Sequence, residues 1–320
     1  MKRLILIVIG TVLVVVAGGY VWLYTPSLER STLMARYDTA ASQFLPLPGG
    51  GEVHVQVEGA PDGSPLVLLH GSNSHLLSWD PWVAELQEFQ IVTIDLPGHG
   101  LTGTLPNGRY TVAEAVQIVH HVVEALDLAR VVIGGSSRGG AVAALYTVAH
   151  AERVAGLVLV DASGWLQGQD VPEEPEDMPL GWRLARLPVI SAAIEHATPR
   201  WLIKQGLDSA VADPAALTDQ AVDQYWDMLR YNGNRAATVQ RFTQIEPRPV
   251  IDADQIQVPT LILWGEQDRL IPVDQARRWH EALPDSDLII YPELGHLPAE
   301  EAPAKTAADL TAFLREKVGF

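Results

Sequence analysis

A serine lies between two glycines in the stretch Gly135-Ser136-Ser137-Arg138-Gly139. The run Val131-Val132-Ile133 before it predicts a buried strand, and the small residues after it predict a helix. In a G-x-S-x-G turn between a strand and a helix, the central serine is held in a strained conformation that exposes its hydroxyl. The sequence therefore predicts that Ser137 is a nucleophile, whereas Ser136 occupies the wrong place in the turn.

A serine hydroxyl needs a neighbouring base, and that base needs a third group to orient it. His296 follows a predicted strand at Leu288 to Tyr291, and Asp268 lies just past the preceding strand. Asp161 follows another apolar run and is the alternative acid. We expect Ser137 to attack, His296 to carry the proton and Asp268 to orient the imidazole.

A tetrahedral oxyanion needs two hydrogen-bond donors in addition to these three side chains. Leu69-His70-Gly71-Ser72 ends an apolar run that we expect beside the nucleophile strand. The backbone N–H groups of Ser72 and Arg138 are the predicted oxyanion hole. The Arg138 side chain has two open interpretations: it pairs with a carboxylate, or it favours acidic substrates.

Short apolar runs alternate with helical patterns along most of the chain, which predicts a mostly parallel sheet covered on both faces. The runs lie at Val53–Val57, Leu66–Leu69, Ile91–Ile94, Val131–Ile133, Leu157–Val160, Leu261–Leu263 and Leu288–Ile290. The alternation lapses over 162–258, which holds Pro172, Pro175, Pro179 and Pro188, an acidic patch at Glu173–Asp177 and helical patterns. This segment is predicted to be a helical cap over the carboxyl edge of the sheet. Five aromatic residues are expected to pack it, with one or two facing substrate: Trp165, Trp182, Trp201, Tyr225 and Trp226.

The N-terminal segment has the pattern of a membrane anchor. Lys2 and Arg3 precede Leu4–Tyr24, which is 21 residues without a charge, long enough to cross about 30 Å of hydrocarbon as a helix. The basic end is expected to stay cytoplasmic, with the catalytic domain on the periplasmic or extracellular side. A cleaved signal peptide ending near Ala17-Gly18-Gly19 is the alternative, and it gives a secreted protein. Residues 25–43 are expected to be a polar connector.

Composition excludes several classes of function. The 320 residues carry a formal charge of −17, which argues against nucleic acid or an anionic bilayer as an electrostatic partner. The chain has no cysteine, so disulfides, thiol catalysis and thiolate metal sites are excluded. The oligomeric state stays open.

Taken together, these motifs resemble the α/β-hydrolase fold superfamily in its capped, esterase-like branch. The resemblance rests on His70-Gly71, Asp95-Leu96-Pro97-Gly98-His99-Gly100, Gly135–Gly140, Val160-Asp161-Ala162, Val258–Asp268 and Gly295-His296 followed by Glu301 and Pro303. It implies a doubly wound core over 44–161 and 259–320, interrupted by the cap at 162–258 and preceded by the anchor at 1–24. It also implies hydrolysis through an acyl-serine intermediate, without a metal ion or an organic cofactor.

The expected substrate is a small carboxylic ester with an apolar acyl or alcohol group. A C–C bond or lactone hydrolase with the same three side chains is the first alternative. A non-catalytic binding protein on this fold is the second.

Overall fold

The computed structural model describes residues 10–11, 18–167, 180, 183, 187, 195–243 and 250–320. Its centre is an eight-stranded sheet in the order β1-β2-β4-β3-β5-β6-β9-β10. The strands are β1 (Ser42–Pro46), β2 (Glu52–Gly59), β3 (Pro65–Leu69), β4 (Gln90–Ile94), β5 (Val131–Ser136), β6 (Val154–Val160), β9 (Thr260–Gly265) and β10 (Ser286–Tyr291). Strand β2 pairs antiparallel with both of its neighbours, β1 and β4, and the other five pairs are parallel. The predicted mostly parallel sheet is therefore confirmed.

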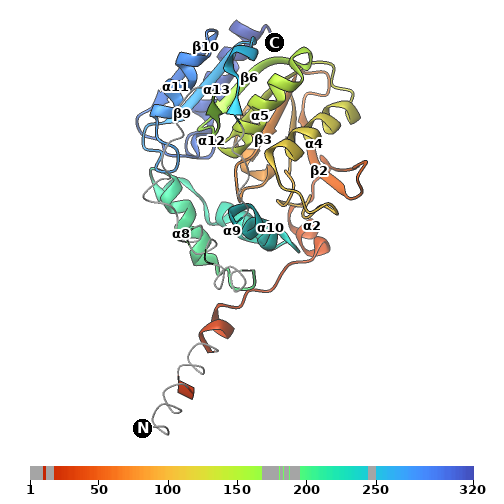
Figure 1. Ribbon diagram of the computed structural model, residues 1–320, viewed down its shortest axis with the longest axis vertical. Helices are drawn as coiled ribbons and strands as arrows, with labels where there is room; N and C mark the ends of the chain where they lie inside the picture. The colour runs from red at the N-terminus through yellow and green to blue at the C-terminus, as the bar shows by residue number, and fades with distance from the viewer. Residues whose placement is uncertain are drawn as a thin grey trace.

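Helices cover both faces of this sheet (Figure 1). Helices α4 (Val112–Ala125), α5 (Arg138–Ala149) and α11 (Asp274–Ala282) pack on one face. Helices α3 (Asp80–Glu85) and α13 (Pro303–Phe313) pack on the other. A strand buried on both faces needs apolar side chains at every position, which explains the continuous apolar runs of the sequence.

Between β6 and β9 the chain leaves the sheet. It forms β7 (Trp165–Leu166), α8 (Arg200–Ala210), α9 (Asp219–Leu229), α10 (Asn234–Thr243) and β8 (Val250–Ile251). The three helices gather below the core in Figure 1. The predicted acidic patch at 173–177 lies outside the described residues, and the division into core and cap stays a prediction.

The predicted connector contains a helix that the sequence pattern did not indicate. Helix α2 (Arg30–Tyr37) inserts Leu33, which is fully buried, into a cluster with Leu76, Leu77, Leu101 and Met228. The Tyr37 hydroxyl donates to the Asp227 carboxylate of α9 at 2.9 Å, and Arg36 forms an ion pair with the same carboxylate. Helix α2 thus packs against the core and is hydrogen-bonded to α9.

The predicted membrane span at 4–24 lies largely outside the described residues. Within the part of the chain that the structure describes, no helix combines the length and the apolar character needed to cross a bilayer. The described end of the segment has exposed aromatic side chains, with Trp22 77% and Tyr24 53% exposed.

Candidate active site

Ser137 occupies the turn between β5 and α5 with φ 51° and ψ −122°, in a region that non-glycine residues rarely adopt. Its backbone N–H donates to the Val160 carbonyl at 3.0 Å, and its carbonyl accepts from Gly140 and Ser163 N–H groups at 3.0 and 2.9 Å. A Cβ at Gly139 would lie 2.2 Å from the Leu69 carbonyl oxygen, so only glycine fits there. Such a conformation costs about 1–3 kcal/mol and persists because these bonds over-determine it.

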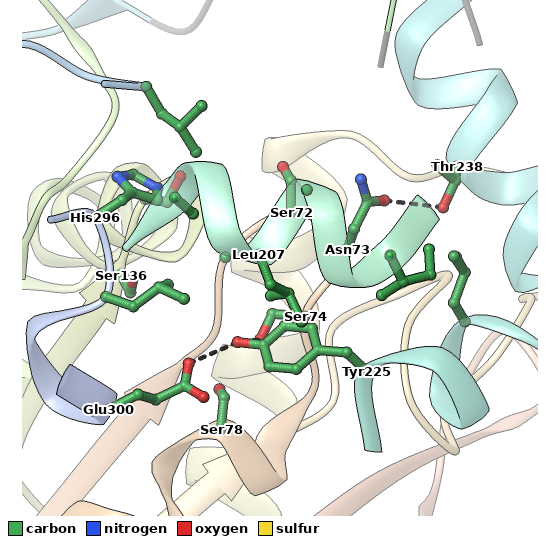
Figure 2. A pocket seen from close by; sticks show the side chains of 18 of the residues that line it. Ser72, Asn73, Ser74, Ser78, Ser136, Leu207, Tyr225, Thr238, His296 and Glu300 are labelled. Carbon is green, nitrogen blue, oxygen red and sulfur yellow. Dashed lines mark hydrogen bonds between the residues drawn. The ribbon is translucent and has the colours of Figure 1, made fainter. Parts of the chain in front are cut away.

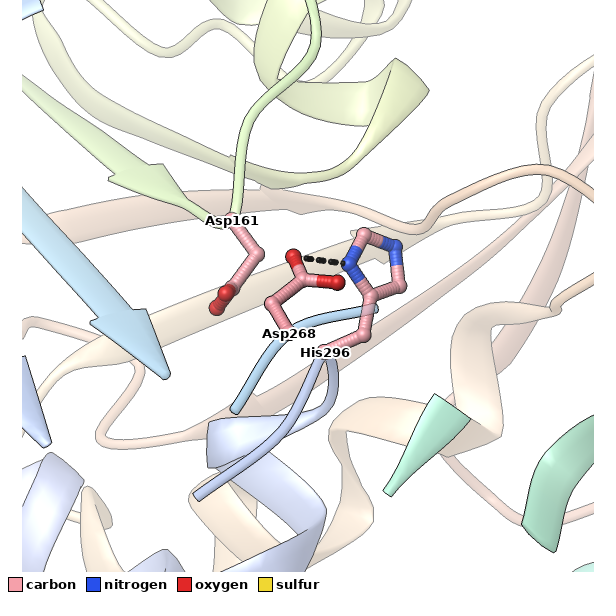
Figure 3. Close-up of side chains that lie close together, drawn as sticks. All are labelled: Asp161, Asp268 and His296. Carbon is pink, nitrogen blue, oxygen red and sulfur yellow. Dashed lines mark hydrogen bonds and ion pairs between the residues drawn. The ribbon is translucent and has the colours of Figure 1, made fainter. Parts of the chain in front are cut away.

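His296 and Asp268 form a buried hydrogen-bonded pair (Figure 3). Nδ1 of His296 lies 2.7 Å from Oδ2 of Asp268. The other oxygen, Oδ1, accepts the backbone N–H groups of Leu270 and Ile271 at 2.7 and 3.0 Å. Three donors therefore fix the Asp268 carboxylate, and the carboxylate in turn fixes the imidazole so that Nε2 is the nitrogen left for a substrate or nucleophile.

Asp161, the alternative acid, lies on the side of Asp268 away from His296 (Figure 3). One carboxylate oxygen of Asp161, one of Asp268 and one ring nitrogen of His296 all lie within 4.8 Å of one another. Oδ1 of Asp161 accepts the Gly265 N–H at 3.0 Å, whereas Oδ2 has no partner among the described residues. Burial, together with the charge of Asp268, raises the pKa of Asp161 well above its ordinary value. A proton on Asp161 therefore relieves the repulsion between the Asp161 and Asp268 carboxylates. Among the described residues, Asp161, Asp268 and His296 are also the group that could hold a metal cation.

The predicted oxyanion loop approaches the serine closely. A Cβ at Gly71 would lie 3.1 Å from the Ser137 Cβ. The buried His70 ring fixes this loop: Nδ1 lies 2.7 Å from the Gly71 carbonyl oxygen, and Nε2 accepts the Leu96 N–H at 3.0 Å. Nδ1 must therefore carry the proton, and burial first of all lowers the pKa of His70 to about 4. The sequence showed His70 only as part of a motif, and its role as a brace comes from the structure.

Arg138 is the first residue of α5, where backbone N–H groups point out of the helix end. Its guanidinium donates to the Tyr110 carbonyl oxygen, and Arg138 is not among the described residues that line the cavity. This hydrogen bond supports neither of the two predicted roles of the Arg138 side chain. Pairing with a carboxylate and selection of acidic substrates both stay predictions. Ser136 does line the cavity, next to Ser137.

A cavity of about 160 Å³ lies between the edge of the sheet and helices α8, α9 and α10. Ser72, Ser137 and His296 line it from the core, and Leu202, Leu207, Tyr225 and Thr238 line it from α8, α9 and α10. Figure 2 shows a second polar group, in which the Tyr225 hydroxyl donates to the Glu300 carboxylate at 2.6 Å. Tyr225 is one of the aromatic residues expected to pack the cap or face substrate. Glu300 was missed, because the motif after His296 contains its neighbour Glu301 and no local pattern marks Glu300.

Residues 66–309 match the profile of the family described as "Alpha/beta hydrolase family". The chain is 28% identical over 81% of its length to the dihydrolipoyllysine-residue acetyltransferase component of the acetoin cleaving system of Pseudomonas putida, of which it spans 65%. It is 26% identical to the 2-hydroxy-6-oxononadienedioate/2-hydroxy-6-oxononatrienedioate hydrolase of Paraburkholderia xenovorans, over 83% of this chain and 92% of that one. The crystal structure of a bacterial membrane phospholipase A superposes with a TM-score of 0.70 at 24% identity, covering 98% of both chains, and this likeness shows the fold.

Proposed function

The chain belongs to the α/β-hydrolase family, and on that premise we propose that it is a serine hydrolase that cleaves carboxylic esters. The observation that carries the proposal is the hydrogen-bonded pair of Asp268 and His296, which shares one cavity with the strained Ser137. Ser137, His296 and Asp268, the proposed nucleophile, base and orienting acid, each follow a different strand of one sheet. They therefore lie at its carboxyl edge, where ligand sites form in open α/β sheets.

In the proposed mechanism, Ser137 Oγ attacks the ester carbonyl carbon while His296 Nε2 takes the hydroxyl proton. The carbonyl oxygen becomes an oxyanion, which the backbone N–H groups of Ser72 and Arg138 stabilise. As the tetrahedral intermediate collapses, His296 returns the proton to the leaving alkoxide, and an alcohol departs. Water then attacks the acyl-serine with the same base, and the acid product is released.

The cavity favours a neutral ester over the dicarboxylate substrate that the name of the Paraburkholderia relative states. Among the described residues that line the cavity, none is a lysine or an arginine, and the Glu300 carboxyl faces the same space. Arg241 donates to Asn73 and Thr238 of the lining at 3.2 and 2.8 Å but is not itself among the lining residues. An incoming carboxylate would thus lose its hydration without contacting a cationic lining side chain. The support for ester cleavage over C–C cleavage is therefore electrostatic.

A substrate panel tests this proposal. We expect release of acid from neutral esters such as p-nitrophenyl butyrate, and turnover of a 2-hydroxy-6-oxo-dienedioate at least 100-fold lower in kcat/KM. Faster turnover of the dienedioate would replace the ester proposal with C–C hydrolysis. Absence of turnover for both classes, without covalent labelling of Ser137, would favour a binding protein.

We also propose that residues 4–24 anchor the protein in a membrane with the catalytic domain on the non-cytoplasmic side. The support is the uncharged run behind Lys2 and Arg3 and the exposed aromatic rings of Trp22 and Tyr24 at its end. Full-length protein should stay with membranes during alkaline carbonate extraction. An intact mass corresponding to a chain that begins near Tyr20 would show a cleaved signal peptide instead.

A further inference from the structure

Four polar side chains form one corner of the cavity, and the proposed hydrolysis does not use them. This polar corner consists of Ser74, Ser78, Tyr225 and Glu300 (Figure 2). The rest of the described lining is mainly apolar and includes Leu202, Ile203, Leu207, Leu229, Leu270 and Leu297. A polar group in an apolar cavity costs free energy unless it has a partner, so the corner needs an explanation.

Glu300 differs sharply from the residue that follows it. The Glu301 carboxylate accepts the backbone N–H groups of Gly295, Leu297 and Ala212 at 2.8–3.1 Å, and so supports the loop that carries His296. Glu300 receives one hydrogen bond, from Tyr225, through Oε1. No lysine, arginine or histidine of the described residues lies within ion-pair distance of it. Glu301 is thus structural, and the second oxygen of Glu300 is available to the cavity.

The hydroxyl donors of the polar corner already donate hydrogen bonds within the protein. Tyr225 donates to Glu300 at 2.6 Å, Ser74 donates to the Tyr225 oxygen at 3.2 Å, and Ser78 donates to the His75 carbonyl at 2.7 Å. The Ser78 hydroxyl also lies beside the Tyr225 hydroxyl and therefore belongs to the same group of atoms. What remains for a ligand is the lone pairs of Ser74 and Ser78 and the Oε2 atom of Glu300.

The protonation of Glu300 decides what that oxygen offers. Burial, with the nearby charges of Glu301 and Asp80, raises the pKa of Glu300 to about 8, against the opposing effect of the Tyr225 hydrogen bond. At neutral pH the carboxyl therefore holds its proton, and because Oε1 accepts from Tyr225, the proton resides on Oε2. The corner then presents one donor, from Glu300, and hydroxyl oxygens of Ser78 and Ser74 that can accept.

We propose that the polar corner is a binding subsite for a hydroxyl group that the substrate carries on the chain beyond its ester group. This inference rests on the proposed ester hydrolysis and adds the chemical class of the substrate: a hydroxylated ester with an otherwise apolar chain. A hydroxyl donates once and accepts from another group, which matches the pair of Glu300 and Ser78.

Charged groups fit the corner less well. A carboxylate would face Glu300 with no described cation beside it, and Glu301 and Asp80 add like charge nearby. An ammonium group would need Glu300 to give up the proton that its surroundings favour. An apolar chain end would leave the Glu300 and Ser78 atoms without partners, and sites built to bind a hydroxyl reject analogues that lack it.

The experiment compares matched ester pairs that differ by one terminal hydroxyl. Methyl 6-hydroxyhexanoate and methyl hexanoate place the group on the acyl side, and 6-hydroxyhexyl acetate and hexyl acetate place it on the alcohol side. Acid release at pH 7 gives kcat/KM for each. We expect the hydroxylated member of one pair to be favoured by about tenfold to a hundredfold in the wild-type protein.

Variants separate recognition from a structural role. Glu300→Leu should abolish the preference, Glu300→Gln should keep most of it through its amide N–H, and Tyr225→Phe should weaken it. Tyr291→Phe is the matched control, because the Tyr291 hydroxyl donates to Asp309 at 2.8 Å outside the described cavity lining. The preference is a ratio within one protein, so a general loss of folded enzyme leaves it unchanged.

Calorimetric binding of hexane-1,6-diol and hexan-1-ol gives a readout that does not need turnover. Tighter binding of the diol to wild type, lost in Glu300→Leu, supports the subsite even if no ester is cleaved, and in that case the proposed function alone fails. Equal or weaker binding of the diol, or no hydroxyl preference in either ester pair, overturns the subsite. Preference for an ammonium-bearing ester over the hydroxylated one overturns it as well.

Discussion

Replacing Asp268 by asparagine leaves one side of the residue unable to accept the hydrogen bonds that the carboxylate accepts there. The carboxylate serves two sides: Oδ1 accepts from Leu270 and Ile271 at 2.7 and 3.0 Å, and Oδ2 pairs with His296 Nδ1 at 2.7 Å. An amide has one oxygen. If the amide oxygen faces the backbone N–H groups of Leu270 and Ile271, both of those hydrogen bonds are kept. If the oxygen faces His296 instead, one hydrogen bond is kept and the amide NH₂ lies against two backbone donors.

The first orientation wins by about 1–3 kcal/mol, the cost of leaving a buried donor unsatisfied. The amide NH₂ then faces Nδ1 of His296, which has to accept, so the proton moves to Nε2. An Nε2–H cannot take the proton of Ser137. We expect Asp268→Asn to lower kcat about 10⁴-fold, equivalent to about 5 kcal/mol of barrier, without a large change in KM.

Asp161→Asn is the matched control. Its surroundings raise the pKa of Asp161 well above the ordinary value and so favour the neutral form, which asparagine imitates in size and charge. Its amide oxygen can still accept the Gly265 N–H. We expect a loss in kcat below about tenfold, measured with p-nitrophenyl butyrate and with circular dichroism to verify folding. Comparable kcat for wild type and Asp268→Asn, or an equal loss in Asp161→Asn, would refute this account of the buried pair.

Three further predictions address other parts of the molecule. For an apolar ester, kcat/KM should fall as pH rises through about 8, because Glu300, near Tyr225, Glu301 and Asp80, then becomes charged. Glu300→Gln should remove that fall, and a fall that persists in this variant has another source. Leu33→Ala should reduce the free energy of unfolding by about 2–5 kcal/mol in urea titration, and a change below 0.5 kcal/mol would show that α2 is not part of the core. Ser136→Ala should retain kcat within about threefold. An inactive Ser136→Ala would show that Ser136, and not Ser137, is the nucleophile.

The sequence predicted the sheet well because strands buried on both faces leave an unambiguous pattern. Runs such as Val131–Ile133 and Leu157–Val160 need apolar side chains at every position, and they form β5 and β6. The turn motif at Ser137 was equally readable, since its glycines are required by contacts as short as 2.2 Å in the folded chain. Local patterns therefore placed Ser137, Asp268 and His296 at the ends of their strands.

Features that depend on contacts between distant residues could not be predicted this way. Helix α2 has mixed polarity, and Leu33 is its one buried residue. Its other contacts, such as that of Tyr37 with Asp227, join residues far apart in the chain. The difference between Glu300 and Glu301 is invisible in the sequence, because it arises from the backbone N–H groups of one and the Tyr225 hydroxyl of the other. The brace formed by His70 likewise depends on Leu96, which lies 26 residues away.

Covalent trapping of the nucleophile tests the central claim most directly. We expect a fluorophosphonate to add one phosphonyl group to the wild-type protein and to Ser136→Ala, with the adduct mapped by peptide mass spectrometry to Ser137, and to leave Ser137→Ala unmodified. Labelling should slow strongly in Asp268→Asn, because the same proton transfer to His296 is required. An adduct on Ser136, or a folded wild-type protein that resists labelling while Ser137→Ala still cleaves esters, would contradict the account.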